Sequence, residues 1–216
     1  MKKFILLFLI LLPSFACADD ARTGRPHWSL ELKGGAFFPA TANWSQFYGS
    51  SYLGENRGSL SYKVHRNVEV GIEVSYGSAT GKGQAVSSSG TVPAGEVTSQ
   101  HAPLNVFVLA RGIFNENQWL VPYAGGGYTR MFYRLEVKDQ GTTQGSVNGY
   151  HARGGVQLLL DALDSDAAKS LYKEARIYHT YLFVEGKYTR AMANTVSGDS
   201  LNIGGTSCLG GFLFEF

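Results

Sequence analysis

The end of the chain places the tightest constraint on its fold. Phe212, Phe214 and Phe216 alternate with Leu213 and Glu215 up to the last residue. Side chains two positions apart share one face of a β-strand, so this pattern predicts a strand with an aromatic face. Segments of the same period recur along most of the chain. The sequence therefore predicts an all-β protein.

The beginning of the chain has the features of an export signal. Lys2 and Lys3 precede the apolar run Phe4–Leu12, and Ala16–Ala18 fits a small-x-small cleavage motif. We therefore predict a cleaved signal peptide at residues 1–18 and one mature domain at residues 19–216.

Two alternatives to cleavage are an N-terminal membrane anchor and a lipoprotein acylated at Cys17. The apolar run is too short to cross a bilayer as a helix. Ser14 and Phe15 fit the acylation motif poorly, because a small residue should follow an aliphatic one there.

Removing the signal changes the charge and cysteine content of the chain. The 19 basic residues fall to 17, which equals the number of acidic residues. A formally neutral chain argues against a nucleic-acid partner. Cys208 is then the remaining cysteine, so no internal disulfide is expected.

No mature segment is apolar for long enough to form a membrane-spanning helix. A chain in a bilayer must satisfy its backbone hydrogen bonds internally, which leaves a closed barrel as the solution. We count eight strands, with the clearest hairpin at Leu60–Val64 and Val68–Tyr76, joined by the turn at His65–Asn67. Longer connections are predicted at residues 41–56, 80–99, 138–146 and 194–200.

The segment Asp161–Arg176 interrupts the strand period with a helical one. Its apolar residues recur every four positions, and Asp164 lies where a helix N-terminus favours an acidic or capping residue. The predicted fold is thus an eight-stranded antiparallel transmembrane up-and-down β-barrel with a short periplasmic helix between strands 6 and 7. We expect the helix to plug or cap the lower mouth; docking of a periplasmic partner is the alternative.

Charged residues alternate with the apolar rows and are predicted to face the interior. A lipid-facing Arg or Lys at the bilayer midplane costs about 2–4 kcal/mol, which favours the apolar rows outside. On the fifth strand this rule directs Val121, Tyr123 and Met131 outward. The predicted interior network consists of Glu31, Lys33, Lys63, Glu73, Arg111, Arg130, Arg134, Arg153, Glu185 and Lys187. Paired charges of both signs would fill so small a barrel; an ion pathway is the alternative.

With its export signal, strand pattern and terminal segment Leu209–Phe216, the chain resembles the small outer-membrane β-barrels of the OmpA/OmpX and OmpW-like type. The resemblance implies an outer-membrane location among lipid and lipopolysaccharide. It also implies that Phe212, Phe214 and Phe216 form an assembly signal, read by the barrel-assembly machinery, with periplasmic chaperones as further partners.

Three functions are compatible with this sequence. We favour a non-enzymatic barrel with a structural role, or with outer loops that contact a surface ligand. A narrow channel for small or hydrophobic solutes, as in OmpW-like proteins, is the alternative. A lipid-modifying enzyme would need a Ser/His pair and a carboxylate, for which His151, Ser146, Ser200 and Asp199 are the candidates. No motif fixes their spacing, and we expect no catalytic, cofactor or metal site.

Overall fold

The computed structural model describes residues 26–41, 43–87, 90–115, 118–138, 141–194 and 200–216. The predicted signal peptide therefore lies outside the described residues. The elements are β1 (Trp28–Pro39), α2 (Trp44–Tyr48), β2 (Leu53–His65), β3 (Val68–Ser87), β4 (Gly90–Arg111), β5 (Leu120–Val137), β6 (Gly141–Leu159), α3 (Ser165–Ala175), β7 (His179–Asn194), β8 (Ser200–Asn202) and β9 (Gly205–Glu215).

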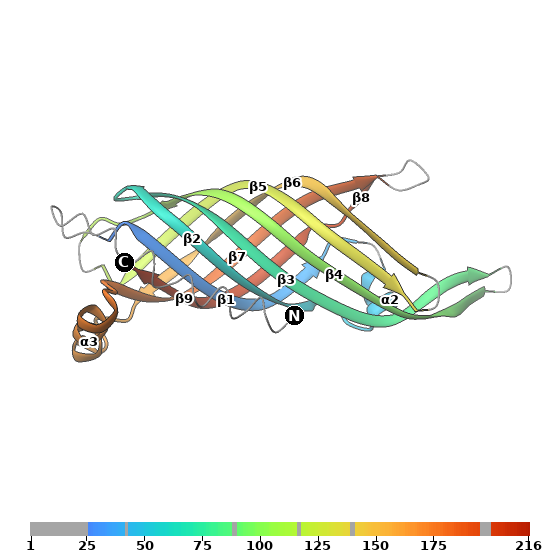
Figure 1. The fold of residues 1–216 in the computed structure, drawn as a ribbon, viewed down its shortest axis with the longest axis horizontal. Helices are drawn as coiled ribbons and strands as arrows, with labels where there is room; N and C mark the ends of the chain where they lie inside the picture. Colours follow the sequence, from blue (N-terminus) through green and yellow to red (C-terminus); the bar gives the residue numbers. More distant parts are fainter. Residues whose placement is uncertain (1–25, 42, 88–89, 116–117, 139–140, 195–199) are drawn as a thin grey trace.

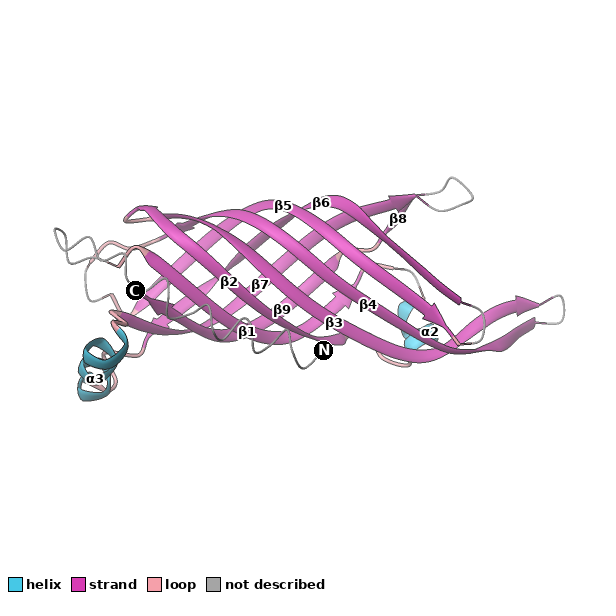
Figure 2. Cartoon of the chain, viewed as in Figure 1, coloured by secondary structure: helices cyan, strands magenta, loops and turns pink. Residues whose placement is uncertain are grey.

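Eight of the strands form a closed barrel (Figures 1 and 2). The neighbour order is β6-β5-β4-β3-β2-β1-β9-β7, and pairing of β6 with β7 closes the ring. Neighbouring strands are antiparallel throughout. The short strand β8 pairs with the end of β7 and stands apart from the ring. The predicted eight-stranded antiparallel barrel is thus confirmed.

The two ends of the barrel differ in character. The β2–β3 turn, α3 and the C-terminal residue lie at one end, which we call the turn end (Figure 1). There the Trp28 amide donates to the Phe216 carbonyl over 3.1 Å, joining the first strand to the end of the chain. The opposite, hairpin end carries the β3–β4 hairpin and α2.

The outer surface of the barrel carries a belt of apolar side chains. Val70, Ile72, Val106, Val108 and Val184 stand on outward rows and are 38% to 64% exposed. β-Branched residues suit strands. Exposure of so many apolar side chains indicates a surface that contacts lipid.

Three of the predicted loops are largely ordered strand or helix. The Gly- and Ser-rich segment 80–99 was expected to be irregular, but β3 runs to Ser87 and β4 begins at Gly90. Segment 138–146 falls mostly within β6, and segment 41–56 contains α2 and the start of β2. The loop predictions were wrong because strand pairing overrides a weak local preference against strand.

The last strand also differs from the expectation, since residues 201–216 divide into β8 and β9. Residues 195–199, most of the fourth predicted loop, lie outside the described residues.

The helix between the sixth and seventh barrel strands is confirmed as α3. Asp164 is its N-cap, and one carboxylate oxygen accepts from the amides of Asp166 (3.2 Å) and Ala167 (2.9 Å). No residue of α3 is buried, and it projects from the turn end (Figure 1), so the expectation that it plugs or caps the mouth was wrong. Neither described helix has the length and hydropathy needed to cross a membrane.

Candidate functional site

The candidate site is the charged interior of the barrel. Alternate residues of each strand point inward, so acids and bases from distant segments meet in the middle of the ring. Among the described residues, six carboxylates and six cationic side chains lie there. They are Glu31, Glu55, Glu69, Glu73, Glu185 and Glu215, with Lys33, Arg57, Lys63, Arg111, Arg153 and Lys187.

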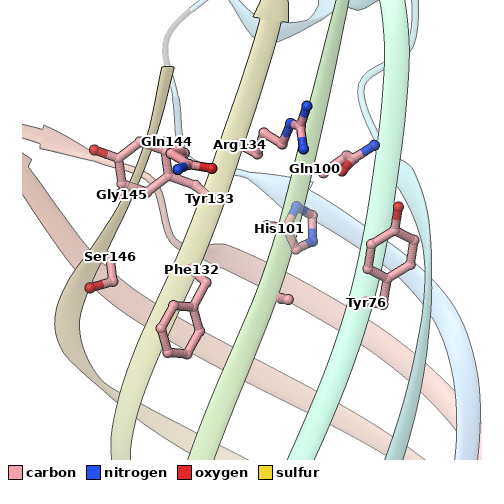
Figure 3. A pocket seen from close by; sticks show the side chains of 10 residues that line it. Tyr76, Gln100, His101, Phe132, Tyr133, Arg134, Gln144, Gly145 and Ser146 are labelled. Atoms are coloured by element: carbon pink, nitrogen blue, oxygen red, sulfur yellow. The ribbon is translucent and has the colours of Figure 1, made fainter. Parts of the chain in front are cut away.

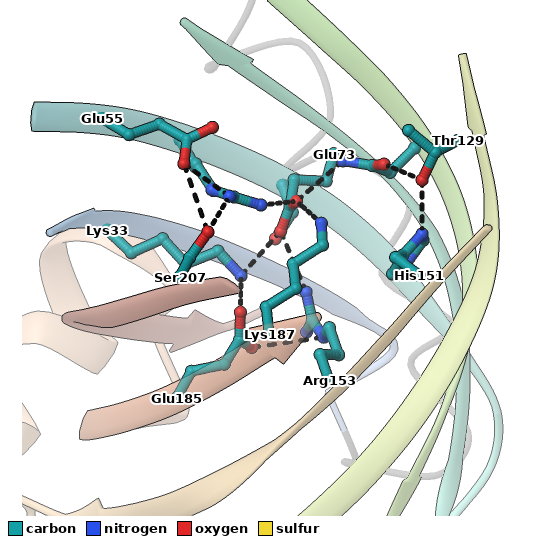
Figure 4. A network of polar contacts seen from close by, with 12 residues as sticks. Lys33, Glu55, Glu73, Thr129, His151, Arg153, Glu185, Lys187 and Ser207 are labelled. Atoms are coloured by element: carbon teal, nitrogen blue, oxygen red, sulfur yellow. Dashed lines mark hydrogen bonds and ion pairs between the residues drawn. The ribbon is translucent and has the colours of Figure 1, made fainter. Parts of the chain in front are cut away.

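Glu73 of β3 is the centre of the larger ion cluster (Figure 4). Its carboxylate lies 2.7 Å from the Lys33 ammonium and 3.1 Å from the guanidinium groups of both Arg57 and Arg153. The Lys187 ammonium also donates to it. These four cations come from β1, β2, β6 and β7, so Glu73 links strands on opposite sides of the barrel.

Two further carboxylates contact two of these cations, Lys33 and Arg153. Glu31 lies 2.9 Å from Arg153 and 3.0 Å from Lys33. Glu185 lies 3.0 Å from Lys33 and 3.3 Å from Arg153, and accepts a hydrogen bond from the Tyr123 hydroxyl over 3.0 Å. Lys33 and Arg153 therefore each face three carboxylates, whereas Lys187 pairs with Glu73.

A smaller ion cluster lies near the turn end. The Arg111 guanidinium pairs with Glu69 over 2.9 Å and also with Glu215. Lys63 pairs with Glu215 over 2.7 Å. Glu215 precedes the last residue, so this cluster ties the terminal strand β9 to β2, β3 and β4.

Apolar side chains fill the space around the two ion clusters. The buried hydrophobic cluster contains Phe107, Leu109, Val121, Tyr123, Leu159, Tyr181, Phe183 and Leu213. The Arg153 guanidinium lies 4.3 Å from the centre of the Phe107 ring, and Arg111 lies 5.1 Å from that of Tyr181. Cation–π contacts of this kind stabilise a desolvated guanidinium.

The equal numbers of buried acids and bases have an energetic consequence. An unpaired charge in a dry interior costs several kcal/mol, whereas good ion-pair geometry offsets much of that cost. The arrangement therefore keeps both signs paired in the middle of the barrel.

The structure brings together eight of the ten side chains predicted to form the interior network. Glu31, Lys33, Lys63, Glu73, Arg111, Arg153, Glu185 and Lys187 all point inward. Arg130 and Arg134 do not: both are exposed on the outward row of β5. Their assignment to the network was wrong because the inward row of β5 is the apolar one, with Val121, Tyr123 and Met131 buried.

Sequence reasoning also missed two interior charges, Glu55 and Arg57. The Arg57 guanidinium lies 2.5 Å from Glu55 and donates to the Ser207 hydroxyl over 2.6 Å. Glu55 was assigned to the loop predicted at residues 41–56, and Arg57 was assigned to neither that loop nor the following strand. The alternation Leu53, Glu55, Arg57, Ser59 on one face of β2 was the signal that could have revealed them.

The residues considered for lipid hydrolysis do not form a pair. His151 is buried inside the barrel, with its Nδ1 2.9 Å from the Thr129 hydroxyl. Ser146 lies on the exposed row of β6, and Ser200 begins β8. Asp199 lies outside the described residues. No group of potential metal ligands occurs in the described part of the chain.

Phe212 and Phe214 lie on β9, which pairs with β1 and β7, and Phe216 follows its last residue. Phe212 is 47% exposed on the outer face, and its ring lies 6.5 Å from that of Phe214. Phe216 pairs through its backbone with Trp28. The rings are thus accessible from outside the barrel, and their reading as an assembly signal stays a prediction.

Comparison with known proteins identifies the fold. No family model and no curated protein matches the sequence. Among solved structures, Neisserial surface protein A (NspA) is similar over 88% of this chain and 97% of its own, with a TM-score of 0.56 and 10% identity.

Two other solved structures cover similar shares at lower TM-scores. The N-terminal barrel of Pseudomonas aeruginosa OprF is similar over 87% of this chain and 97% of its own, with a TM-score of 0.46 and 11% identity. Yersinia pestis Ail is similar over 88% of this chain and 99% of its own, with a TM-score of 0.46 and 10% identity. The chain has the fold of the small eight-stranded outer-membrane β-barrels, as the sequence predicted. This fold and the apolar belt agree with the predicted outer-membrane location.

Proposed function

We propose that this protein is an integral outer-membrane barrel with a sealed interior, which presents the β3–β4 hairpin to a partner at the cell surface. The observation that carries the proposal is the length of this hairpin. β3 and β4 pair from Val68 and Ala110 out to Ser87 and Gly90. The hairpin projects beyond the rest of the barrel (Figures 1 and 2).

The projecting part of the hairpin has strand edges without a strand partner among the described residues. β2 pairs with β3 only as far as Gly77, and β5 pairs with β4 only as far as Val97. Unpaired N–H and C=O groups on such edges are suited to receive an extended peptide as an added strand. A protein ligand with an exposed strand is the partner that fits this geometry.

The short helix α2 supports the base of the hairpin. A Cβ atom added at Gly81 would lie 2.3 Å from the Phe47 carbonyl oxygen, so the backbones of α2 and β3 are in direct contact. Burial raises the pKa of the Tyr48 hydroxyl, which is hydrogen-bonded to the Ser99 side chain. These contacts fix the direction in which the hairpin leaves the barrel.

The paired interior supports a structural barrel over a channel. The purified protein should give no current steps above background in planar lipid bilayers. Reproducible conductance steps would favour the narrow-channel alternative instead.

The surface role is tested by shortening the hairpin. Residues 80–97 are replaced by a two-residue Asn-Gly turn, and adhesion of cells carrying this variant is measured. A matched control removes residues 135–144 from the β5–β6 hairpin at the same end. Loss of adhesion in the first strain alone supports the proposal, whereas unchanged adhesion refutes it. Gel mobility of unheated and boiled samples verifies that both variants fold.

A further inference from the structure

β5 and β7 carry the same three-residue sequence, and the two copies are offset by two residues in register. Tyr128-Thr129-Arg130 in β5 matches Tyr188-Thr189-Arg190 in β7. In both copies the threonine is buried in the interior, while the tyrosine and the arginine are exposed outside. The two copies flank β6, whose Tyr150 pairs with Tyr128 on one side and Arg190 on the other.

Arg130 and Arg190 each come after a row of outward residues that are suited to contact with lipid. Moving from the turn end, the outward residues of β5 from Leu120 to Tyr128 and those of β7 from Thr180 to Tyr188 carry no charge. Tyrosine is enriched where a membrane meets water, and the cost of an outward arginine falls to about 0–1 kcal/mol at that level. Tyr128, Tyr150 and Tyr188 therefore mark the interface, and the two arginines lie at head-group level.

Neither arginine has an acidic partner among the described residues. Arg130 donates to the Ser146 hydroxyl over 3.1 Å and lies 5.6 Å from the centre of the Phe132 ring. Arg190 is hydrogen-bonded to Tyr150. Arg134, in contrast, pairs with Glu136 over 3.4 Å. Two positive charges held by neutral neighbours are complementary to an anionic group, and a guanidinium fits phosphate well.

A shallow depression of about 480 Å³ spans β3 to β6 near Arg130, and Arg134 is among the residues that line it (Figure 3). It is lined in part by Tyr76, Gln100, Phe132, Gln144 and Ser146 from four adjacent strands. Ser146 both lines the depression and accepts the hydrogen bond from Arg130. Amide and hydroxyl groups between aromatic rings suit a sugar, whose ring has polar edges and apolar faces.

We propose that Arg130 and Arg190 bind the phosphate groups of a phosphorylated glycolipid in the outer leaflet, with part of its sugar head group in the adjoining depression. The two arginines stand on strands either side of β6 and are offset by two residues in register, so their backbones are about 12 Å apart. The site rests on the proposed outer-membrane location, and it is independent of the role of the β3–β4 hairpin.

The experiment measures glycolipid binding by the full mature chain in detergent micelles. The probes are a phosphorylated lipopolysaccharide, the same glycolipid after enzymatic dephosphorylation, and phosphatidylglycerol. Native mass spectrometry counts bound lipid for the wild type, for the double variant Arg130→Gln/Arg190→Gln, and for the control Arg66→Gln. Arg66 lies in the exposed turn at the opposite end, so its substitution removes a positive charge away from the site.

The proposal predicts at least a tenfold loss of lipopolysaccharide affinity in the double variant and less than a twofold change in the control. Dephosphorylated glycolipid should bind the wild type as weakly as lipopolysaccharide binds the double variant. Equal affinity of the double variant and the wild type would overturn the site, and so would equal binding of phosphatidylglycerol and lipopolysaccharide. The hairpin-shortened variant should bind like the wild type, which separates this result from the test of surface adhesion.

Discussion

The Glu73 carboxylate and the Arg153 guanidinium lie 3.1 Å apart in the interior although 80 positions separate them in the chain. Glu73 stands on β3 and Arg153 on β6, and neither side chain is exposed to solvent. Closure of the barrel brings them together, and the contact of Glu73 with Lys187 of β7 depends on the same closure, whereas Arg57 stands on the adjacent strand β2. The middle of this protein is therefore stabilised in part by ion pairs that form only in the complete ring.

Removing the charge of Glu73 should destabilise the barrel strongly. Glu73→Gln leaves four buried cations with one carboxylate fewer, and breaking a buried ion pair costs about 3–5 kcal/mol. Urea unfolding of the protein refolded in lipid vesicles measures the change. Glu136→Gln is the matched control, since its exposed pair with Arg134 should contribute at most about 1 kcal/mol. Equal effects of the two substitutions would contradict the central role of Glu73.

Alanine at Gly127 should disturb the pairing of β4 with β5. Its Cβ would lie 1.9 Å from the Val106 carbonyl oxygen, so the backbone must shift, and overpacking of this kind costs about 1–3 kcal/mol. At Gly186 the nearest atom is 3.9 Å away, and alanine there should be neutral or stabilising by up to about 1 kcal/mol. Urea unfolding in lipid vesicles compares the stabilities of the Gly127→Ala and Gly186→Ala variants. Similar stabilities would show that β4 and β5 are less closely packed than described.

The orientation of β5 can be tested with single cysteines. In a background carrying Cys208→Ser and lacking residues 1–18, Arg130→Cys should react readily with a water-soluble maleimide. Met131→Cys should be protected, because Met131 is 2% exposed inside the barrel. Mass spectrometry of the labelled protein gives both rates. The opposite order of reactivity would restore the orientation first expected from the sequence.

Loss of the N-cap should loosen α3 without affecting the barrel. Asp164→Ala removes the acceptor for two amides, and a cap of this kind contributes about 1 kcal/mol. Amide hydrogen exchange at Ala168 should accelerate about fivefold, the factor that corresponds to this energy. Lys169→Ala, which removes an exposed pair with Asp166, should change the rate by less than about twofold. Unchanged exchange in Asp164→Ala would argue that other contacts hold the helix.

Much of the interior could be predicted from local alternation alone. Glu31 and Lys33 were placed inside because Leu32, between them, belongs to the lipid-facing row. The same reasoning failed at Arg130 and Arg134. It assumed that the apolar row of every strand faces lipid, whereas Val121 and Tyr123 pack against Phe107 and Leu109 inside the ring.

The sequence by itself determined the period of the strands, their number and the position of α3, because these depend on neighbouring residues within a few positions of one another. Only the tertiary structure decided which row of β5 faces inward, how far the β3–β4 hairpin continues, and that Glu73 meets cations from four other strands. The first and the last of these depend on contacts across a closed ring, and the second depends on pairing between two strands that continue beyond it. Inside the ring, a side chain is stabilised by partners that are distant in sequence, so the local sequence pattern does not identify them.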